Sequence, residues 1–219
     1  MADRPDARLI ELGVEAQADL IVVGTHQSHG ISRLRRPSVS RGILRHAPMS
    51  VACVPAFAAS PIPGRSAREC RRVLVAVDLN QRPGFAVPCG YSIVQSGGTV
   101  RLLHNSPPFR LPDPTIGVFF QEHPTEEDRA QFVANCESSL RAFVPAGAEA
   151  RGITTEVEVT DSRETADAIC SAAERFDADV VCIGGHTRPT FTAKVLGSVS
   201  LAVLQDSGRP VLVVWPPAE

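Results

Sequence analysis

The stretch Ile183–Ser200, IGGHTRPTFTAKVLGSVS, carries the pattern around which this chain is built. An apolar run, Asp179–Ile183, leads into it and is typical of a buried parallel strand. Gly184 follows the predicted strand, and Gly197 and Ser198 come where an amphipathic helical pattern begins. Glycine lets a backbone approach a phosphate closely, and the first N–H groups and the dipole of a helix favour anions. The stretch therefore predicts a strand–loop–helix unit suited to phosphate, although many such turns carry glycine for backbone reasons only.

The same pattern occurs earlier in the chain. Residues 20–55 read LIVVGTHQSHGISRLRRPSVSRGILRHAPMSVACVP, and residues 180–215 read VVCIGGHTRPTFTAKVLGSVSLAVLQDSGRPVLVVW. The two align without a gap at an offset of 160, which places Ser38 on Ser198 (198 − 38 = 160). An internal repeat of this length indicates that one structural unit is used twice.

Composition excludes several classes of protein. The chain has 219 residues, of which 43% are hydrophobic and 21% charged, so it is a globular protein with a real core. A net charge of −2 and sparse aromatic residues argue against a nucleic-acid-binding surface. No apolar run is long enough to span a bilayer, and the N-terminal MADRPDARLI lacks the shape of a signal peptide. We expect neither nucleic acid nor membrane as a partner.

The six cysteines form no CxxC pair, and most of them lie inside apolar patterns. This usage indicates buried thiols in a reducing compartment rather than a zinc site or a disulfide framework. We therefore expect a cytoplasmic protein without a metal site of its own.

The first part of the chain predicts only part of a domain. It reads as helix 5–17, strand 19–23, a helix from Ser38 to about residue 46 and strand 50–54, the alternation of a parallel sheet. Two strands are marginal alone and would leave the edge at Leu20–Val23 open. Residues 56–69, rich in Pro, Ala, Ser and Gly, read as a linker.

A complete unit follows. Strands are predicted at 72–79, 99–104, 154–159, 178–183 and 210–215, and helices at 84–96, 125–143, 162–176 and 198–205. Pro88 and Gly90 interrupt the predicted helix 84–96, whereas Thr125 is suited to cap the predicted helix 125–143. The five prolines of residues 105–124 predict an irregular, mobile excursion between the second strand and that helix. The unit is α/β, a doubly wound domain with five parallel strands.

These residues resemble the universal stress proteins, a family of the adenine-nucleotide alpha-hydrolase-like fold. Its nucleotide-binding members carry Gly, two residues, Gly, nine residues, Gly, then Ser or Thr. Here Gly184, Thr187, Gly197 and Ser198 keep that register, with Thr187 in place of the second glycine. The strand VLVAVD, the strand LLH and the segment SVSRGILRHAP are also similar to the family. The resemblance covers residues 71–217 as a whole domain and residues 5–55 as the second half of one.

The resemblance implies a domain organisation: a half-domain repeat over residues 1–57, a linker over 58–70 and a complete domain over 71–219. It implies strand order 3-2-1-4-5 and pairing between domains through the fifth strand. It also implies ATP or AMP as a ligand, with Mg²⁺ accompanying ATP. The nucleotide-binding residues are then Asp78, at the end of the first strand near the adenine or ribose, with Gly184, Thr187, Gly197 and Ser198.

Several alternatives stay open. Asp78 either contacts a nucleoside or caps the next turn. Thr187 is costly if its position needs a positive φ, and otherwise can offer its hydroxyl. In the first stretch Gln27 and Pro37 replace two glycines, and Pro37 removes an amide, so we expect no nucleotide site there.

Two functions therefore compete. One is a stress-response module that binds ATP or AMP in residues 71–219, and the other is an interaction scaffold of the same family without a nucleotide. An enzyme is the weakest reading, with at most slow ATP hydrolysis, because no serine has the setting of a nucleophile elbow.

The open edge leads to a structural prediction. Ser50–Val54 should pair antiparallel with Val211–Trp215, which makes an internal pseudo-dimer. The exposed strand Leu20–Val23 then needs either further residues upstream or a second chain, so a homodimer or an unknown protein partner is expected.

Overall fold

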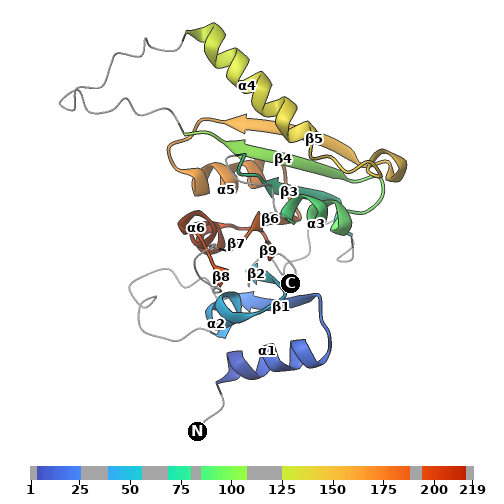
Figure 1. Ribbon diagram of the computed structural model, residues 1–219, viewed down its shortest axis with the longest axis vertical. Coiled ribbons are helices and arrows are strands. Elements are labelled where there is room, and N and C mark those ends of the chain that lie inside the picture. Colours follow the sequence, from blue (N-terminus) through green and yellow to red (C-terminus); the bar gives the residue numbers. More distant parts are fainter. Residues whose placement is uncertain are drawn as a thin grey trace, which may run out of the picture.

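The computed structural model describes residues 4–25, 39–55, 69–79, 85–107, 125–187 and 194–215. A sheet of seven strands runs through the molecule in the order β1-β2-β9-β6-β3-β4-β5, with helices on both faces (Figure 1). Its strands are β1 (Leu20–Thr25), β2 (Ser50–Pro55), β3 (Arg72–Ala76), β4 (Thr99–Asn105), β5 (Thr154–Thr160), β6 (Val180–Gly184) and β9 (Val211–Val214). The helices are α1 (Pro5–Glu15), α2 (Val39–His46), α3 (Ala86–Ile93), α4 (Glu126–Arg141), α5 (Thr165–Arg175) and α6 (Ser198–Asp206), and a 3₁₀ turn spans Glu149–Arg151.

The strand order of the later part of the chain follows the expected pattern. Between residues 72 and 214 the strands lie in the order β5-β4-β3-β6-β9, which reads 3-2-1-4-5 when they are numbered along that segment, and all neighbours pair in parallel. As a description of the whole sheet, however, the predicted five parallel strands are wrong. β1 and β2 extend the sheet to seven strands, and it is mixed because β2 pairs with β9 antiparallel.

Elements of the same type recur at the offset of 160 residues. We call residues 5–55 the first copy (α1, β1, α2, β2) and residues 165–215 the second copy (α5, β6, α6, β9). Gln17 and Asp177, at equivalent positions, are the non-glycine residues with positive φ in the described chain, at 52° and 51°. Each helix ends in the same hydrogen bond, Ala18 N–H to Gly13 O and Ala178 N–H to Ala173 O, both 2.9 Å. Both copies thus turn from helix to strand through the same left-handed cap.

The joint between β2 and β9 connects the copies. The paired residues are Val51 with Val213, Ala52 with Leu212 and Cys53 with Val211. Residues 52 and 212 are equivalent (212 − 52 = 160), so the pairing is symmetric about them. The predicted antiparallel pairing of these two strands is confirmed.

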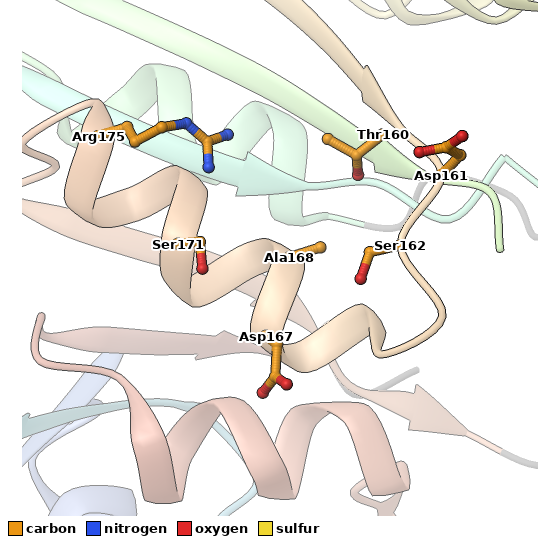
Figure 2. Close-up of a pocket in the computed structure, with 7 residues that line it drawn as sticks. All are labelled: Thr160, Asp161, Ser162, Asp167, Ala168, Ser171 and Arg175. Carbon is orange, nitrogen blue, oxygen red and sulfur yellow. The ribbon is translucent and has the colours of Figure 1, made fainter.

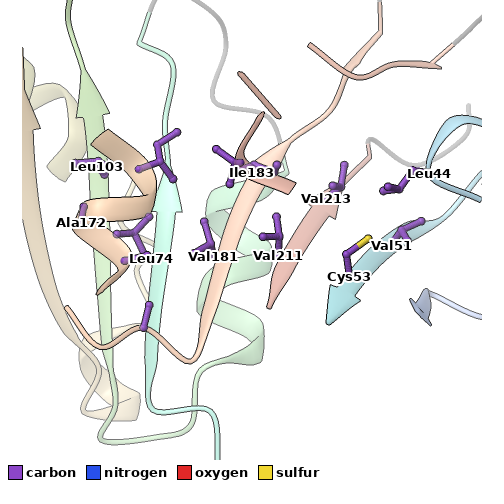
Figure 3. Packing of buried hydrophobic residues seen from close by; sticks show 14 of the residues in the cluster. Leu44, Val51, Cys53, Leu74, Leu103, Ala172, Val181, Ile183, Val211 and Val213 are labelled. Atoms are coloured by element: carbon purple, nitrogen blue, oxygen red, sulfur yellow. The ribbon is translucent and has the colours of Figure 1, made fainter. Parts of the chain in front are cut away.

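Buried side chains form one layer on each face of the sheet. On one face, α2, α5 and α6 cover a cluster that continues from Leu103 on β4 to Val51 on β2, across the joint (Figure 3). On the other face, α3 and α4 cover β3, β4, β6 and β9, with Tyr91 and Leu140 buried among strand residues. The first layer therefore includes both copies, whereas the second lies over the later part of the chain.

Helix α3 forms in spite of its two helix-breaking residues. Pro88 is in the first turn, where a missing N–H leaves no intrahelical hydrogen bond unmade. Gly90 faces the sheet so closely that a Cβ there would overlap the Val75 side chain. The helix thus uses its glycine for close packing on β3.

Helix α4 begins as predicted, at Thr125. The Asp128 N–H donates to Thr125 Oγ1 at 3.1 Å and the Thr125 N–H donates to Asp128 Oδ2 at 2.9 Å, which completes a capping box. The hydrogen bond from the Thr125 hydroxyl lowers the pKa of Asp128 below its ordinary value. Most of the predicted linker, the excursion from residue 108 on and the Ser38 cap lie outside the described residues.

Candidate functional site

The predicted site residues lie around the point where the strand order reverses. From β3 the chain proceeds through β4 to β5 on one side, and from β6 it proceeds to β9 on the other. Doubly wound sheets bind ligands at the carboxyl ends of the strands at such a point. Because Ala76 lies opposite Ile183, Asp78 and Gly184 follow neighbouring strands at the same edge. The fold thus brings together residues more than a hundred positions apart.

Two hydrogen bonds from β4 fix the segment before Asp78. The Val77 N–H donates to Leu103 O at 2.8 Å, and His104 Nδ1 lies 2.9 Å from Val77 O. A carbonyl oxygen only accepts, so Nδ1 of His104 carries a hydrogen and donates it. His104 is buried, whereas Asp78 is exposed at the sheet edge. The sequence analysis did not predict this role of His104. The one sequence feature that could have indicated it is a polar residue at the end of an apolar strand.

The two glycines at the end of β6, Gly184 in the strand and Gly185 directly after it, serve different purposes. At Gly185 a Cβ would overlap the indole ring of Trp215, and the Gly185 N–H donates to Val214 O at 2.9 Å. At Gly184 a Cβ would meet no atom of the described residues within 4 Å. Neither has positive φ, since the glycines with positive φ in the described chain are Gly97 and Gly152. Gly185 is needed for packing, and Gly184 leaves open space at the edge where a ligand is expected.

The segment after Gly185 contains a two-stranded ribbon that the sequence did not predict. β7 (His186–Thr187) pairs antiparallel with β8 (Lys194–Val195), His186 opposite Val195. Gly184 precedes His186 by two residues, and Gly197 follows Val195 by two residues. The ribbon therefore brings the end of β6 toward the start of α6. Thr187 does not have positive φ, so the backbone cost considered for a threonine at this position does not arise.

The start of α6 supplies backbone donors. Gly197 is the N-cap residue, with φ −64° and ψ 161°, and no side chain caps this end of the helix among the described residues. The first N–H groups of a helix lack intrahelical acceptors and lie at its positive end. Ser198, the first helical residue, is exposed and adds a hydroxyl. This end of α6 therefore has backbone N–H donors and a hydroxyl close together.

The corresponding edge of the first copy is described only in part. For Gly24, in β1, no atom of the part of the chain that the structure describes lies within 4 Å of where a Cβ would be. The Thr25 hydroxyl points back to Val54 O, at 3.5 Å. Gln27 and Pro37, on which the prediction of no nucleotide site depends, lie outside the described residues.

A polar hollow of about 280 Å³ lies elsewhere, at the carboxyl end of β5 beside α5 (Figure 2). It is lined by Thr160, Asp161, Ser162, Asp167, Ala168, Ser171 and Arg175. Two of its three charged groups already have partners, since Arg175 pairs with Glu158 and Asp161 pairs with Arg129. None of the predicted site residues lines it, and it is not at the point of strand reversal, so we do not assign it the nucleotide.

The cysteines show no sign of reactivity. All six are unpaired, and burial raises the pKa of Cys53 to about 12 and that of Cys70 and Cys170 to about 11. A thiol with a raised pKa is a poor nucleophile at neutral pH.

Within the described ranges, no group of three or more His, Cys, Asp or Glu residues is placed to hold a metal ion. In the same ranges, none of the helices has both the length and the apolar character needed to cross a bilayer.

Comparison with known proteins identifies the family. The model of the universal stress protein family matches residues 2–55 and 69–214. This chain belongs to the universal stress protein family. A search of curated proteins finds no match.

Solved structures show the same fold at low sequence identity. A universal stress protein from Archaeoglobus fulgidus is 19% identical with a TM-score of 0.58, and the match covers 97% of this chain and 66% of that one. A functionally unknown protein, PA1789, from Pseudomonas aeruginosa is 18% identical with a TM-score of 0.56, and the match covers 99% and 69% of the two chains. The chain thus spans about two thirds of the length of these two proteins.

A further universal stress protein from Archaeoglobus fulgidus, solved in complex with dAMP, is 19% identical with a TM-score of 0.41, over 65% of this chain and 96% of that one. At this level of likeness it carries no argument about the ligand of the present chain.

Proposed function

We propose that residues 71–219 of this universal stress protein form a complete domain of the adenine-nucleotide alpha-hydrolase-like fold that binds ATP or AMP as part of a cytoplasmic stress response. The observation that carries the proposal is the meeting of an acidic residue, an open glycine and a helix start at the point of strand reversal. Asp78 follows β3, Gly184 ends β6, and the β7–β8 ribbon leads from Gly184 to Gly197.

Each residue has a role that its chemistry allows. The Asp78 carboxylate accepts hydrogen bonds from ribose hydroxyls or the adenine amino group. The open face of Gly184 lets phosphate approach the backbone, and Thr187 offers a hydroxyl where other family members have glycine. The N–H groups of Gly197 and Ser198 donate to phosphate with the α6 dipole aligned. Mg²⁺ would arrive with ATP, bound mainly by its phosphates.

We also propose that residues 1–57 are the second half of another such domain, joined through a linker over 58–70. The shared left-handed cap at Gln17 and Asp177 and the symmetric joint at Ala52 and Leu212 support this assignment. In this view the chain is an internal pseudo-dimer.

A second candidate function is an interaction scaffold of the same family that binds no nucleotide. The observation in its favour is the same symmetric joint, because a core shared between the copies stabilises the molecule without a ligand. The two functions differ in one measurable property, which is nucleotide affinity.

Isothermal titration of ligand-stripped protein with ATP and with AMP, each with and without Mg²⁺, tests the proposal. Gly197→Pro is the informative variant, because φ at Gly197 is −64° and proline prefers about −65°. The change removes an N–H without straining the backbone. A hydrogen bond to a charged group is worth roughly 1.5–3 kcal/mol, so we expect binding about ten- to a hundredfold weaker with an unchanged circular dichroism spectrum.

Gln27→Ala, in the first copy, is the matched control and should leave ATP binding unchanged. Absence of both heat and a thermal shift in the wild type at millimolar ATP would decide for the scaffold. Phosphate release, measured in the same samples, should be slow or absent.

A further inference from the structure

The antiparallel joint brings the end of α2 to the sheet edge that carries the candidate nucleotide site. Gly184 lies opposite Val214 on β9, and Val51, near the start of β2, lies opposite Val213. Neighbouring strands are about 4.8 Å apart, so Gly184 and the start of β2 are separated by two spacings, about 10 Å. Helix α2 ends at His46, shortly before β2 begins. The last turn of α2 therefore lies near the carboxyl ends of β6 and β9.

Helix α2 lies on the same face of the sheet as α6 and next to the segment that leads into α6. Leu44 of α2 and Val203 of α6 belong to one buried layer (Figure 3). Helix α2 also contacts β8, which ends two residues before Gly197 (Figure 1). Leu196, between β8 and Gly197, packs against the same buried layer. The first copy thus contributes to the surroundings of the site proposed in the second copy.

The end of α2 presents positive charge. Arg45 and His46 lie in its last turn, and both are exposed. Within the described residues, neither side chain forms an ion pair or a hydrogen bond. The sequence has no acidic residue between Asp19 and Glu69, so α2 and β2 supply no carboxylate that would neutralise them. A guanidinium without a carboxylate partner is well suited to phosphate, which it binds through two N–H groups.

The equivalent end of α6 carries no positive charge. Arg45 and His46 correspond to Gln205 and Asp206 (205 − 45 = 160). A cation at the end of a helix stabilises the helix dipole, but α6 forms without any basic residue in its last turn. The dipole therefore does not by itself account for the two cations at the end of α2.

The charge at each helix end matches the sequence of the copy that it faces. Because Val211 lies opposite Cys53, the symmetry of the joint places the end of α6 at the carboxyl edge of the first copy. The first copy has Pro37 in its sequence where the second copy has Gly197. Cations thus face the copy that keeps the anion-binding pattern, whereas the carboxylate of Asp206 faces the copy that has lost it.

We infer that Arg45, assisted by His46, binds the distal phosphates of a triphosphate chain held at Gly184 and Gly197. The two side chains reach across the joint, from the first copy into the site of the second. AMP lacks the distal phosphates, so this contact makes the site selective for ATP over AMP. The inference rests on the proposed nucleotide-binding function and deepens it, because it assigns the joint a part in choosing the ligand.

Arg45→Gln, which copies Gln205 of the second copy, is the direct test. In isothermal titrations at about 0.1 M salt we expect ATP to bind roughly tenfold more weakly and AMP to change by less than about twofold. At about 1 M salt the difference for ATP should shrink, because salt screens exposed charges. Arg45 is exposed, so the melting temperature of the ligand-free protein should change little.

Three further variants sharpen the test. Arg41→Gln is the matched control, because it removes the same charge from α2 one turn further from its end, and it should weaken ATP binding by less than about twofold. Arg45→Lys keeps the charge and should retain most of the preference for ATP over AMP. His46→Asp, which copies Asp206, should weaken ATP binding about tenfold or more, because a carboxylate repels the phosphates.

Inorganic tripolyphosphate separates this inference from the proposed function. Binding of tripolyphosphate but not of ATP, weakened about tenfold in Arg45→Gln, would reject the nucleotide and support the phosphate contact. ATP binding that Arg45→Gln leaves unchanged would overturn the inference alone. An equal loss in Arg41→Gln would also overturn it, because the effect would then come from overall charge and not from a contact. Absence of binding of both ligands to the wild type would overturn the inference together with the proposed function.

Discussion

The first and second copies build the same helix–strand–helix–strand unit from aligned sequences, yet they differ in burial. Both turn through a left-handed residue, Gln17 or Asp177, and both contribute one strand to the symmetric joint. Ile169 is nearly buried and its equivalent Leu9 is 43% exposed. The difference shows that local sequence specifies the unit, whereas neighbouring strands decide which of its apolar residues become core.

The two copies also differ at pairs of contacting residues, in which a glycine and the side chain packed against it change together. The second copy has Gly185 against the ring of Trp215, where the first copy has Thr25 and Pro55. The first copy has Asp6 against Gly42, a contact so close that a Cβ at Gly42 would overlap the carboxylate, and the second copy has alanine at both positions. A glycine is kept in each copy where its own partner side chain needs the space.

The largest expected effect tests burial directly. Ile169→Ala should lower the free energy of unfolding by about 2–5 kcal/mol, because it leaves a cavity between α5 and the sheet. Leu9→Ala, at the equivalent position, should cost less than about 1 kcal/mol, because Leu9 is 43% exposed. Urea unfolding of both variants measures the difference. Equal costs would mean that Leu9 is covered in solution.

A smaller effect is expected at the glycine pair. Gly185→Ala forces the new methyl group against Trp215 and should cost about 1–3 kcal/mol by urea unfolding. Gly184→Ala is the matched control, since open space surrounds it and its φ is not positive, and should cost less than about 1 kcal/mol. The reverse order of the two costs would contradict the packing described for Gly185.

The next prediction concerns the aspartate before each strand. Asp179→Ala removes the acceptor for the Arg71 and Arg72 N–H groups, and because these groups are exposed to water the cost should be about 1 kcal/mol. Asp19→Ala, at the equivalent position, should change the melting temperature little. Hydrogen exchange at Arg72 provides a second measurement and should rise in Asp179→Ala only. A melting temperature lowered as much by Asp19→Ala as by Asp179→Ala would contradict this difference between the copies.

The smallest expected effect is a loss of stability of α1 at low pH, which should be confined to the first copy. The hydrogen bond from Arg4 lowers the pKa of Asp6 below its ordinary value of 3.8, so the carboxylate stabilises α1 above that value and loses this contribution as pH falls through the folded pKa. The protection of the α1 amides, measured against their intrinsic exchange rate at each pH, should therefore fall between about pH 4 and pH 2 before that of α5, which has Ala166 at this position. Asp6→Asn should abolish the difference. A difference that persists in Asp6→Asn would assign the acid sensitivity to another group.

The sequence by itself determined the α/β class, the position of nearly every helix and strand, the helix cap at Thr125 and the repeat at an offset of 160. These features depend on local patterns, such as apolar periodicity and helix caps, or on similarity between two stretches of the same chain. Together with the family resemblance, it also selected Asp78, Gly184 and Gly197 as residues that the fold then placed along one sheet edge.

Only the tertiary structure decided which residues support the site and how deeply each apolar residue of the two copies is buried. The support given by His104 to Val77, the overlap that keeps residue 185 a glycine and the ribbon from β7 to β8 all depend on contacts between residues far apart in sequence. No local pattern encodes such contacts, because the same apolar residue is core beside β3 and surface without it. Val22 and Cys182 show this most simply: these equivalent strand positions are 61% and 0% exposed. Among the described residues, Cys182 has a paired strand on each side and α3 above it, whereas Val22 has only β2 as a paired strand.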